Sequence, residues 1–275
     1  MDLRLRALQA LCVPDPAAKV AAVQSLWHAA PGLPLGDRPD GACAPLPGRP
    51  ERPRLVDPRR VPQRSPHTLE GRAALLHAIC HIEFNAINLA LDAVWRFDGM
   101  PRGFHDDWLR VAHEEAYHFS LLHELLQALG HQYGDFEAHD GLWSMCEKTA
   151  GDIVARMALV PRTLEARGLD ATPLIQQRLR AVGTPDALDL CQRLDIILRD
   201  EVGHVAIGNR WYAWLCAREG LDPVGHYRVL VRRHAAPRLR PPFNEAARRA
   251  AGFTQAELDF LLGAEPAADA PQAAG

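Results

Sequence analysis

The sequence has 275 residues, of which 48% are apolar, and its formal net charge is −3. This length suits one large domain or two small ones, and the apolar fraction excludes wholesale disorder because it supplies enough side chains for a packed core. The small net charge excludes a general electrostatic attraction to nucleic acid or to anionic membranes. Lysine occurs only at Lys19 and Lys148, so arginine carries nearly all the positive charge and a single arginine cluster is weakly informative.

The cysteines and the apolar runs bear on the cellular compartment. The six cysteines are scattered and form no C-x-x-C pair, which argues against a zinc ribbon or a thioredoxin-type motif. The N-terminus alternates charged residues with leucine and lacks the apolar core of a secretory signal, and no run reaches the length of a membrane span. We therefore expect a cytoplasmic protein with reduced cysteines and no membrane partner.

The first region of the chain, residues 1–66, combines two short helices with a segment of irregular composition. The helices are predicted at 2–12 and 15–30. Residues 31–66 are rich in Pro, Gly and Arg and carry no apolar period. This segment is either an extended arm that lies over a core or a disordered linker.

The second region, residues 67–220, carries apolar residues at three- and four-residue spacing and is expected to form the bundle. Gly99 and Pro101 separate its first two helices, Pro161 should kink the third or weaken one of its turns, and Gly168 should end it. The helices are predicted at 68–97, 105–129, 141–167, 173–182 and 186–218.

The third region, residues 221–275, is expected to be a C-terminal extension of short helices with a frayed tail from Ala264. These helices are predicted near 222–234, 243–250 and 254–262. Because no part of the chain alternates with a period of two, the predicted fold class is all-α: a four-helix bundle with extra short helices at both ends.

Two of the long helices carry a glutamate and a histidine three residues apart: Glu115 with His118, and Glu201 with His204. Residues at i and i+3 share one helix face, so each pair presents a carboxylate and an imidazole side by side. Both pairs lie on apolar stripes. In four-helix carboxylate proteins two helices each supply such a pair, and the other two helices each supply a lone Glu that points inward.

The first long helix supplies one candidate for a lone glutamate. Glu83 is the single acidic group at the centre of its apolar stripe. An unpaired, ionised carboxylate would be strongly destabilising in that position, so a cation or a proton must neutralise it.

The third helix offers three acids: Glu147, Asp152 and Glu165. We favour Glu165 because its distance along the chain from the second Glu-x-x-His pair resembles the distance of Glu83 from the first. Glu165 lies near the predicted end of its helix. Either the helix continues past Gly168 or another acid is the ligand.

Together these residues predict a site for two metal ions. Four carboxylates and two imidazoles suit iron or manganese better than zinc or copper, so we expect two Fe, with Mn or a mixed Mn/Fe pair as the alternative. Glu114 and Asp200 each precede a histidine by four residues, and each is expected to accept the second N–H either of that imidazole or of the opposite one. The predicted ligands are Glu83, Glu115, His118, Glu165, Glu201 and His204.

Two further groups of residues have competing interpretations. His77 and His81 are four residues apart on the first long helix and are expected to be partly buried or to lie behind the ligands rather than to bind metal. A C-terminal basic segment is either a phosphate- or RNA-binding element or a solvated, self-packing one. It contains Arg228, Arg232, Arg233, Arg238, Arg240, Arg248 and Arg249, opposed only by Glu245.

The motifs around these residues resemble the ferritin-like superfamily. More narrowly, the chain is similar, from about residue 15 to 262, to the family known by a domain of unknown function, DUF455, and Leu164-Glu165-Ala166-Arg167-Gly168 is the most specific part of that similarity. More distantly it resembles a tRNA-modifying di-iron hydroxylase, which also has a Glu-Ala-Arg segment on its third helix. The resemblance implies a ferritin-like bundle, a dinuclear centre and the six ligands above, and it supplies no substrate.

Three functions are compatible with the sequence. The first is a di-iron oxidoreductase or hydroxylase that uses O2 or peroxide on a small-molecule substrate and works as a monomer or dimer. The second is an iron-handling or peroxide-detoxifying protein of the rubrerythrin or ferritin kind, although the Pro-rich arm makes a storage shell awkward. The third is a non-catalytic bundle that binds RNA or another partner through the basic segment.

Overall fold

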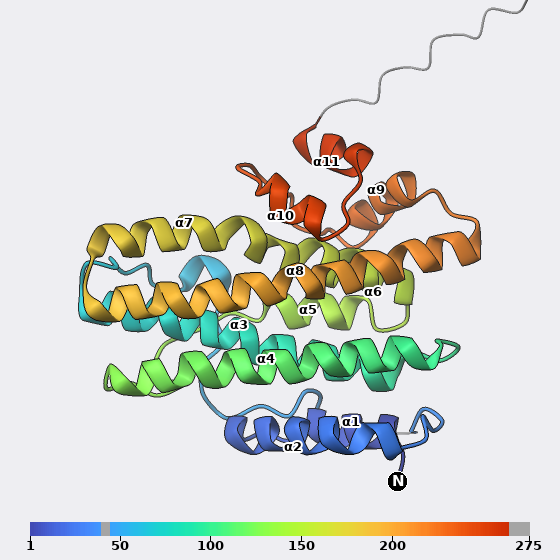
Figure 1. Cartoon of the computed structure of the whole chain (residues 1–275), viewed down its shortest axis with the longest axis horizontal. Coiled ribbons are helices and arrows are strands. Elements are labelled where there is room, and N and C mark those ends of the chain that lie inside the picture. The colour runs from blue at the N-terminus through green and yellow to red at the C-terminus, as the bar shows by residue number, and fades with distance from the viewer. Residues whose placement is uncertain (40–44, 264–275) are drawn as a thin grey trace, which may run out of the picture.

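The computed structural model describes residues 1–39 and 45–263, and within these ranges the chain is an all-α helical bundle, as predicted (Figure 1). The expected frayed tail from Ala264 lies outside the described residues. The helices are α1 (Leu3–Leu11), α2 (Pro16–Ala29), α3 (Leu69–Arg96), α4 (Arg102–Ala128), α5 (Gly141–Lys148), α6 (Ile153–Leu159), the π-helix η3 (Val160–Glu165), α7 (Ala166–Val182), α8 (Pro185–Glu219), α9 (Pro223–Arg233), α10 (Glu245–Ala250) and α11 (Gln255–Leu262), with short 3-10 turns η1 (Ala30–Gly32) and η2 (Pro58–Arg60).

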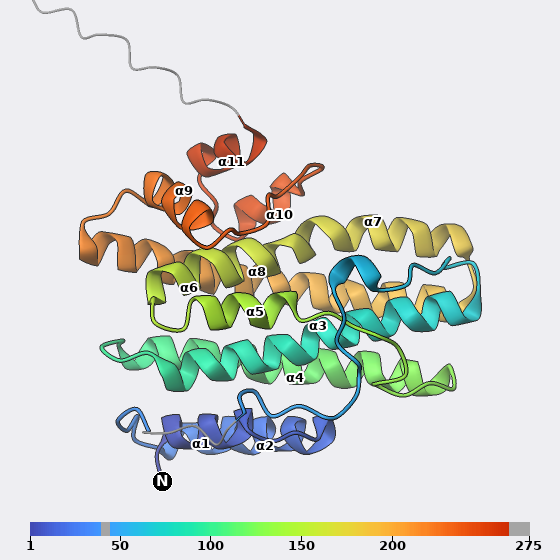
Figure 2. The same ribbon diagram turned by 180° about the vertical axis from the view of Figure 1, so that it is seen from behind.

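The long helices form two helical hairpins that pack against each other. Helices α3 and α4 form one hairpin, and α7 and α8 form the other, closed by Gly183 in the left-handed conformation (φ 71) that an L side chain rarely adopts. In Figure 1 the hairpins lie between α1 and α2 on one side and α9 to α11 on the other. Figure 2 shows the same layers from behind.

Helix α3 is the central helix of the bundle. Among the described helices it alone is long and apolar enough to cross a membrane, and 78% of its most apolar window is buried inside the protein. It packs against α1, α4 and α5. Such burial is the pattern of a helix in a protein core. Ile82, the residue before Glu83, is half exposed.

The prediction of one continuous third helix over 141–167 was wrong. Helix α5 ends at Lys148, and α6 begins only after Asp152, whose side chain accepts a hydrogen bond from the Ala155 amide. The Thr149 hydroxyl donates to the Met145 carbonyl. Short polar side chains that bond to nearby backbone groups compete with the helical pattern, and here they divide the segment in two.

Pro161, predicted to kink the third helix or weaken one of its turns, lies in a π-helix, where the regular α-helical hydrogen-bond pattern is interrupted. It lies in η3, where the wider turn accommodates a residue without an N–H, and the Thr163 hydroxyl donates to the Ala158 carbonyl at 2.7 Å. Helix α8 approaches this segment closely at Gly208. A Cβ built on Gly208 would lie 2.5 Å from the Pro161 Cβ, so only glycine allows this contact.

The expected break at Gly168 is also wrong, because α7 continues from Ala166 to Val182 and includes the separate helix predicted at 173–182. Pro173 lies inside this helix and cannot donate to the Leu169 carbonyl four residues before it. The Asn244 side chain donates to that carbonyl instead, at 3.2 Å. A partner from the C-terminal extension therefore lets the helix pass through a proline, which local sequence did not indicate.

A buried ion-pair network joins α3 to α5 and α6. Asp92 is fully buried and accepts hydrogen bonds from Arg156 Nη1 at 2.5 Å and from Arg96 Nη2 at 2.6 Å. Arg156 also donates to Thr149 Oγ1 and to the Cys146 carbonyl. Burial alone would raise the pKa of Asp92, but Arg156 and Arg96 hold it below its ordinary value, so the carboxylate stays ionised.

We predict that Asp92→Ala lowers the free energy of unfolding by about 3–5 kcal/mol, because it leaves the buried Arg156 without its counter-charge. Urea denaturation followed by circular dichroism measures this change. The control is Asp106→Ala, which removes the partner of Arg102 in an exposed pair and should change stability by less than about 1 kcal/mol. Equal losses in the two variants would contradict the importance of the Asp92 network.

We predict that Gly208→Ala destabilises the protein by about 1–3 kcal/mol, because the added methyl group overlaps Pro161. The matched control is Gly203→Ala on the same helix, where a Cβ would meet nothing within 4 Å. That variant should be neutral or more stable by up to about 1 kcal/mol, since alanine favours helix over glycine. Thermal unfolding of both variants tests the contact; a neutral Gly208→Ala would show that the helices can move apart freely.

Candidate metal centre

The six residues predicted as ligands are all buried, and they project from α3, α4, η3 and α8. Each Glu-x-x-His pair lies on one face of an unbroken helix, so its two side chains point the same way. The described carboxylate, imidazole and thiol atoms that could hold a metal ion form two groups, and both consist of these residues.

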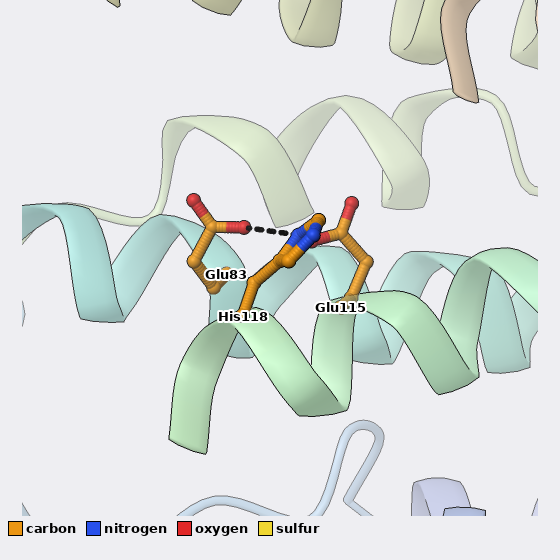
Figure 3. Close-up of side chains that lie close together, drawn as sticks. All are labelled: Glu83, Glu115 and His118. Atoms are coloured by element: carbon orange, nitrogen blue, oxygen red, sulfur yellow. Dashed lines mark hydrogen bonds and ion pairs between the residues drawn. The ribbon is translucent and has the colours of Figure 1, made fainter. Parts of the chain in front are cut away.

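The first cluster joins α3 to α4. It contains Glu83, Glu115 and His118, which offer ligand atoms within 4.8 Å of one another. His118 Nδ1 lies 3.2 Å from Glu115 Oε2 and 3.7 Å from Glu83 Oε2. Figure 3 shows Glu83 reaching from α3 toward the imidazole, with Glu115 on the other side of it.

The second cluster joins α4 to α8. It contains Glu115, Glu201 and His204, again with ligand atoms within 4.8 Å of one another. His204 Nδ1 lies 2.9 Å from Glu115 Oε1 and 3.8 Å from Glu201 Oε1. Glu115 therefore belongs to both clusters and turns one oxygen toward each histidine.

Two further carboxylates bind the histidines through contacts between α4 and α8. His118 Nε2 on α4 lies 3.1 Å from Asp200 Oδ2 on α8, and His204 Nε2 on α8 lies 2.7 Å from Glu114 Oε2 on α4. Each histidine thus pairs with the acid of the opposite helix. A carboxylate can only accept the Nε2–H, which leaves each Nδ1 facing its cluster as the atom able to bind a metal.

Several oxygen atoms of the centre have no hydrogen-bond partner. These include Glu83 Oε2, Glu201 Oε2 and both oxygens of Glu165. Glu115 Oε1 and His204 Nδ1 lie 2.9 Å apart but lack the direction of a hydrogen bond. Buried acceptors without donors are costly, and cations satisfy them directly. The donor set, rich in oxygen with two imidazoles, fits one or two hard divalent ions.

The three acids that the sequence offered on the third helix differ in their hydrogen-bond partners. Glu147 accepts a hydrogen bond from Trp143 Nε1, and Asp152 caps α6, so both have local partners. Glu165 lies at the end of η3, buried and unpartnered, although outside the two tight clusters. Burial, followed by the charges of Glu201 and Glu115, raises the pKa of Glu165 well above its ordinary value.

Burial and the charges of neighbouring groups also shift the pKa values of the other carboxyl groups in the centre. Burial and then the neighbouring Glu115 raise the pKa of Glu83 well above its ordinary value. The same two causes raise the pKa of Glu201. Glu115 is the exception: burial opposes its ionisation, but His204 and His118 together hold its pKa below the ordinary range.

The pKa values of the two histidines are raised, whereas burial alone would lower the pKa of an imidazole. Burial would lower the pKa of His118, but Glu115 and Glu83 raise it to about 11. Burial likewise opposes the charge on His204, and Glu115, Glu114 and Glu201 raise its pKa well above the ordinary value. Protons on the imidazoles therefore balance the acids where cations would do so in a loaded site.

The other histidines of α3 have different partners. His77 Nε2 accepts from the Gly134 amide, and His81 Nδ1 lies 2.8 Å from the Tyr133 hydroxyl. Neither belongs to a group of metal-binding atoms among the described residues.

The basic C-terminal segment is partly internal. Arg248 is fully buried and pairs with Asp170 at 2.6 Å, and Arg228 lies over the Phe260 ring. The RNA partner stays a prediction. The arginines of the segment that face solvent are Arg232, Arg233, Arg238, Arg240 and Arg249.

The sequence did not indicate the contacts that hold η3: Arg162, a residue of η3, pairs with Glu257 of α11 and donates to Asn209 of α8. Pro161 and Gly208 could have indicated an irregular segment at a close helix contact, but nothing in the sequence showed that these two residues lie against each other. Nor did any local pattern show that the C-terminal extension covers this segment.

The fold and the site define a helical-bundle protein with buried carboxylate and histidine clusters that could hold metal ions. The chain matches the family model described as protein of unknown function (DUF455) over residues 12–259, and it belongs to that family. It is 54% identical over 223 residues to an uncharacterized protein of Haemophilus influenzae (strain ATCC 51907 / DSM 11121 / KW20 / Rd), which covers 78% of this chain and 76% of that protein. No solved structure matches the chain.

We predict that metal affinity rises with pH. The imidazolium protons of His118 and His204 must leave before Nδ1 can bind a cation, and the raised pKa of each histidine means that these protons are still held at neutral pH. Titration with Mn(II) between pH 6 and 8 should give tighter binding at each higher pH, with protons released into weak buffer. Binding that is independent of pH, without proton release, would contradict the assignment of these nitrogens.

Proposed function

We propose that the chain is a ferritin-like dinuclear metal carboxylate protein, and that it functions as a di-iron oxidoreductase using O2 or peroxide. The observation that carries this proposal is Glu115: it lies between two carboxylate–histidine clusters and directs one oxygen to each. Two cations on either side of a shared carboxylate would neutralise the buried acids and use the unpaired oxygens described above.

The proposed ligands divide between two ions. Glu83 and His118 would hold one ion and Glu201 and His204 the other, with Glu115 shared and Glu165 completing the acidic set. Iron bound there would supply the redox chemistry that amino-acid side chains lack. Mn or a mixed Mn/Fe pair fits the same donors.

The chain itself contributes orientation and exclusion of water. Asp200 and Glu114 fix the two imidazole rings through Nε2, so the Nδ1 atoms are held in place before metal arrives. Asp200 is itself held by Arg199, which lies 2.8 Å away. Glu83, Glu115 and Glu201 are buried in a bundle whose apolar core α3, α4 and α8 help to form, and this burial keeps bulk water from their carboxylates.

We predict a metal-binding pattern that distinguishes a shared ligand from an ordinary one. Wild-type protein should bind two Fe(II) per chain in anaerobic equilibrium dialysis. Glu83→Ala and Glu201→Ala should each weaken one ion at least about tenfold, and Glu115→Ala should weaken both, because only Glu115 touches both clusters. The control is Glu147→Ala, whose carboxylate contacts Trp143 instead.

In that experiment, a Glu115→Ala variant that retains one tight ion would contradict sharing. Circular dichroism of each variant separates lost ligation from lost folding. Glu83 and Glu201 are costly to bury in the absence of metal, as their raised pKa values indicate, so the metal-free variants should keep their helical content.

The enzymatic role has a test of its own. Fe(II)-loaded wild-type protein should consume O2 or peroxide faster than free Fe(II) in the same buffer, and Glu115→Ala should return the rate to that of free Fe(II). Gel filtration separates the alternatives: a monomer or dimer favours an enzyme, and a large shell favours iron handling. Loaded protein that consumes neither oxidant would contradict the oxidoreductase proposal while leaving metal binding intact.

A further inference from the structure

Glu165 differs from the other proposed ligands in how it is positioned. Its two carboxylate oxygens make no hydrogen bond, and it is the last residue of the π-helix η3 rather than a residue inside a long α-helix. The position of its carboxylate therefore depends on the backbone of η3. A change from the π pattern to the α pattern shifts the register by one residue, which rotates a side chain by about 100° around the helix axis.

The residue that most firmly holds η3 is Arg162. Its side chain is buried and pairs with Glu257 of α11 at 2.6 Å, with both partners less than a tenth exposed. It also donates to Asn209 Oδ1 of α8 at 2.9 Å. Because both charges are buried, loss of either partner would leave the other uncompensated.

Aromatic rings enclose the same guanidinium group. Its central carbon lies 4.8 Å from the Phe253 ring centroid, 5.0 Å from Tyr212 and 5.4 Å from Tyr227. Desolvated cation–π contacts of this kind fix a guanidinium in place. Two of these rings, together with Glu257, come from the C-terminal extension.

The extension also contacts residues on both sides of Glu165 in the sequence. Before it, the Thr163 hydroxyl lies 2.8 Å from the Tyr227 hydroxyl. After it, Arg248 Nη2 donates to the Ala166 carbonyl at 3.4 Å and to Asp170 Oδ2 at 2.6 Å. Figure 1 shows α9 to α11 lying over the outer face of the helices that carry these residues.

We propose that the C-terminal extension, acting through the Glu257–Arg162 pair, positions Glu165 in the metal centre. Glu257 and Arg162 are positioning residues in this account, since neither belongs to the clusters around Glu115. The extension holds η3 in the π pattern, and the π pattern places the Glu165 carboxylate among the acids. This inference rests on the proposed function, because positioning a ligand presupposes that the site binds metal.

The test is a double-mutant cycle with Co(II), whose visible absorption reports the number and geometry of its oxygen and nitrogen ligands. The full chain is used throughout, as wild type, Glu257→Gln, Glu165→Gln and the double variant. Glu257→Gln should weaken the second Co(II) about tenfold and change its spectrum in the same way as Glu165→Gln. The double variant should bind no more weakly than Glu165→Gln alone, because positioning has no further effect once the positioned carboxylate is gone.

Two matched controls separate positioning from general loosening of the extension. Glu245→Gln removes a charge of the same extension that pairs with the exposed Arg249, and it should leave Co(II) binding unchanged. Tyr227→Phe removes only the hydroxyl that meets Thr163 and should weaken the second ion about threefold. Tyr212→Phe removes a hydroxyl that donates to the Pro223 carbonyl instead, and it should not. The tyrosine pair tests the same idea if Glu257→Gln does not fold.

The outcomes are distinct. Wild-type protein that binds no Co(II) removes the proposed function, and this inference with it. Wild-type protein that binds two ions, together with a Glu257→Gln variant that binds them equally well, removes the positioning role alone. Losses that add in the double variant would also overturn it, because they would show that Glu257 acts on stability and not through Glu165.

Discussion

The structure depends on the burial of several carboxylates at one place inside an apolar bundle. Glu115 lies fully buried between two imidazoles, with Glu83 in one cluster and Glu201 in the other, and an oxygen of each of these acids lacks any donor. Charges so close together in a medium of low polarity repel strongly unless cations or protons lie among them. The paired helical hairpins, the crossed Asp200 and Glu114 contacts and the π-helix can all be understood as features that hold these acids together.

Much of this arrangement could be predicted from local patterns. The Glu-x-x-His spacing predicted which face of α4 and of α8 carries the clusters. The apolar stripe around Glu83 predicted the corresponding face of α3. Three- and four-residue periods located the bundle helices and even the short C-terminal ones, because each helix buries one stripe. The sequence allowed two pairings for each histidine, one with the acid of its own helix and one with the acid of the opposite helix. It could not distinguish them, because the pairing depends on how α4 and α8 face each other.

What could not be predicted lies where distant segments override local preference. Thr149 and Asp152 divide a helix that apolar spacing alone would continue. Pro173 is tolerated because Asn244, far along the chain, serves the carbonyl that the proline leaves unpaired. The π-helix needs Gly208 beside Pro161 and an arginine held by the C-terminal extension. Tertiary contacts of this kind produce no periodic pattern in the sequence, so the bounds of the third helix could not be predicted from local spacing.

The most direct measurement of the central claim is the anomalous scattering of crystals grown from protein loaded anaerobically with Fe(II), recorded at the iron absorption edge. The account predicts two peaks enclosed by α3, α4, η3 and α8, one on each side of the Glu115 carboxylate. A map without peaks there, or with Glu83, Glu115 and Glu201 turned away from one another, would contradict it.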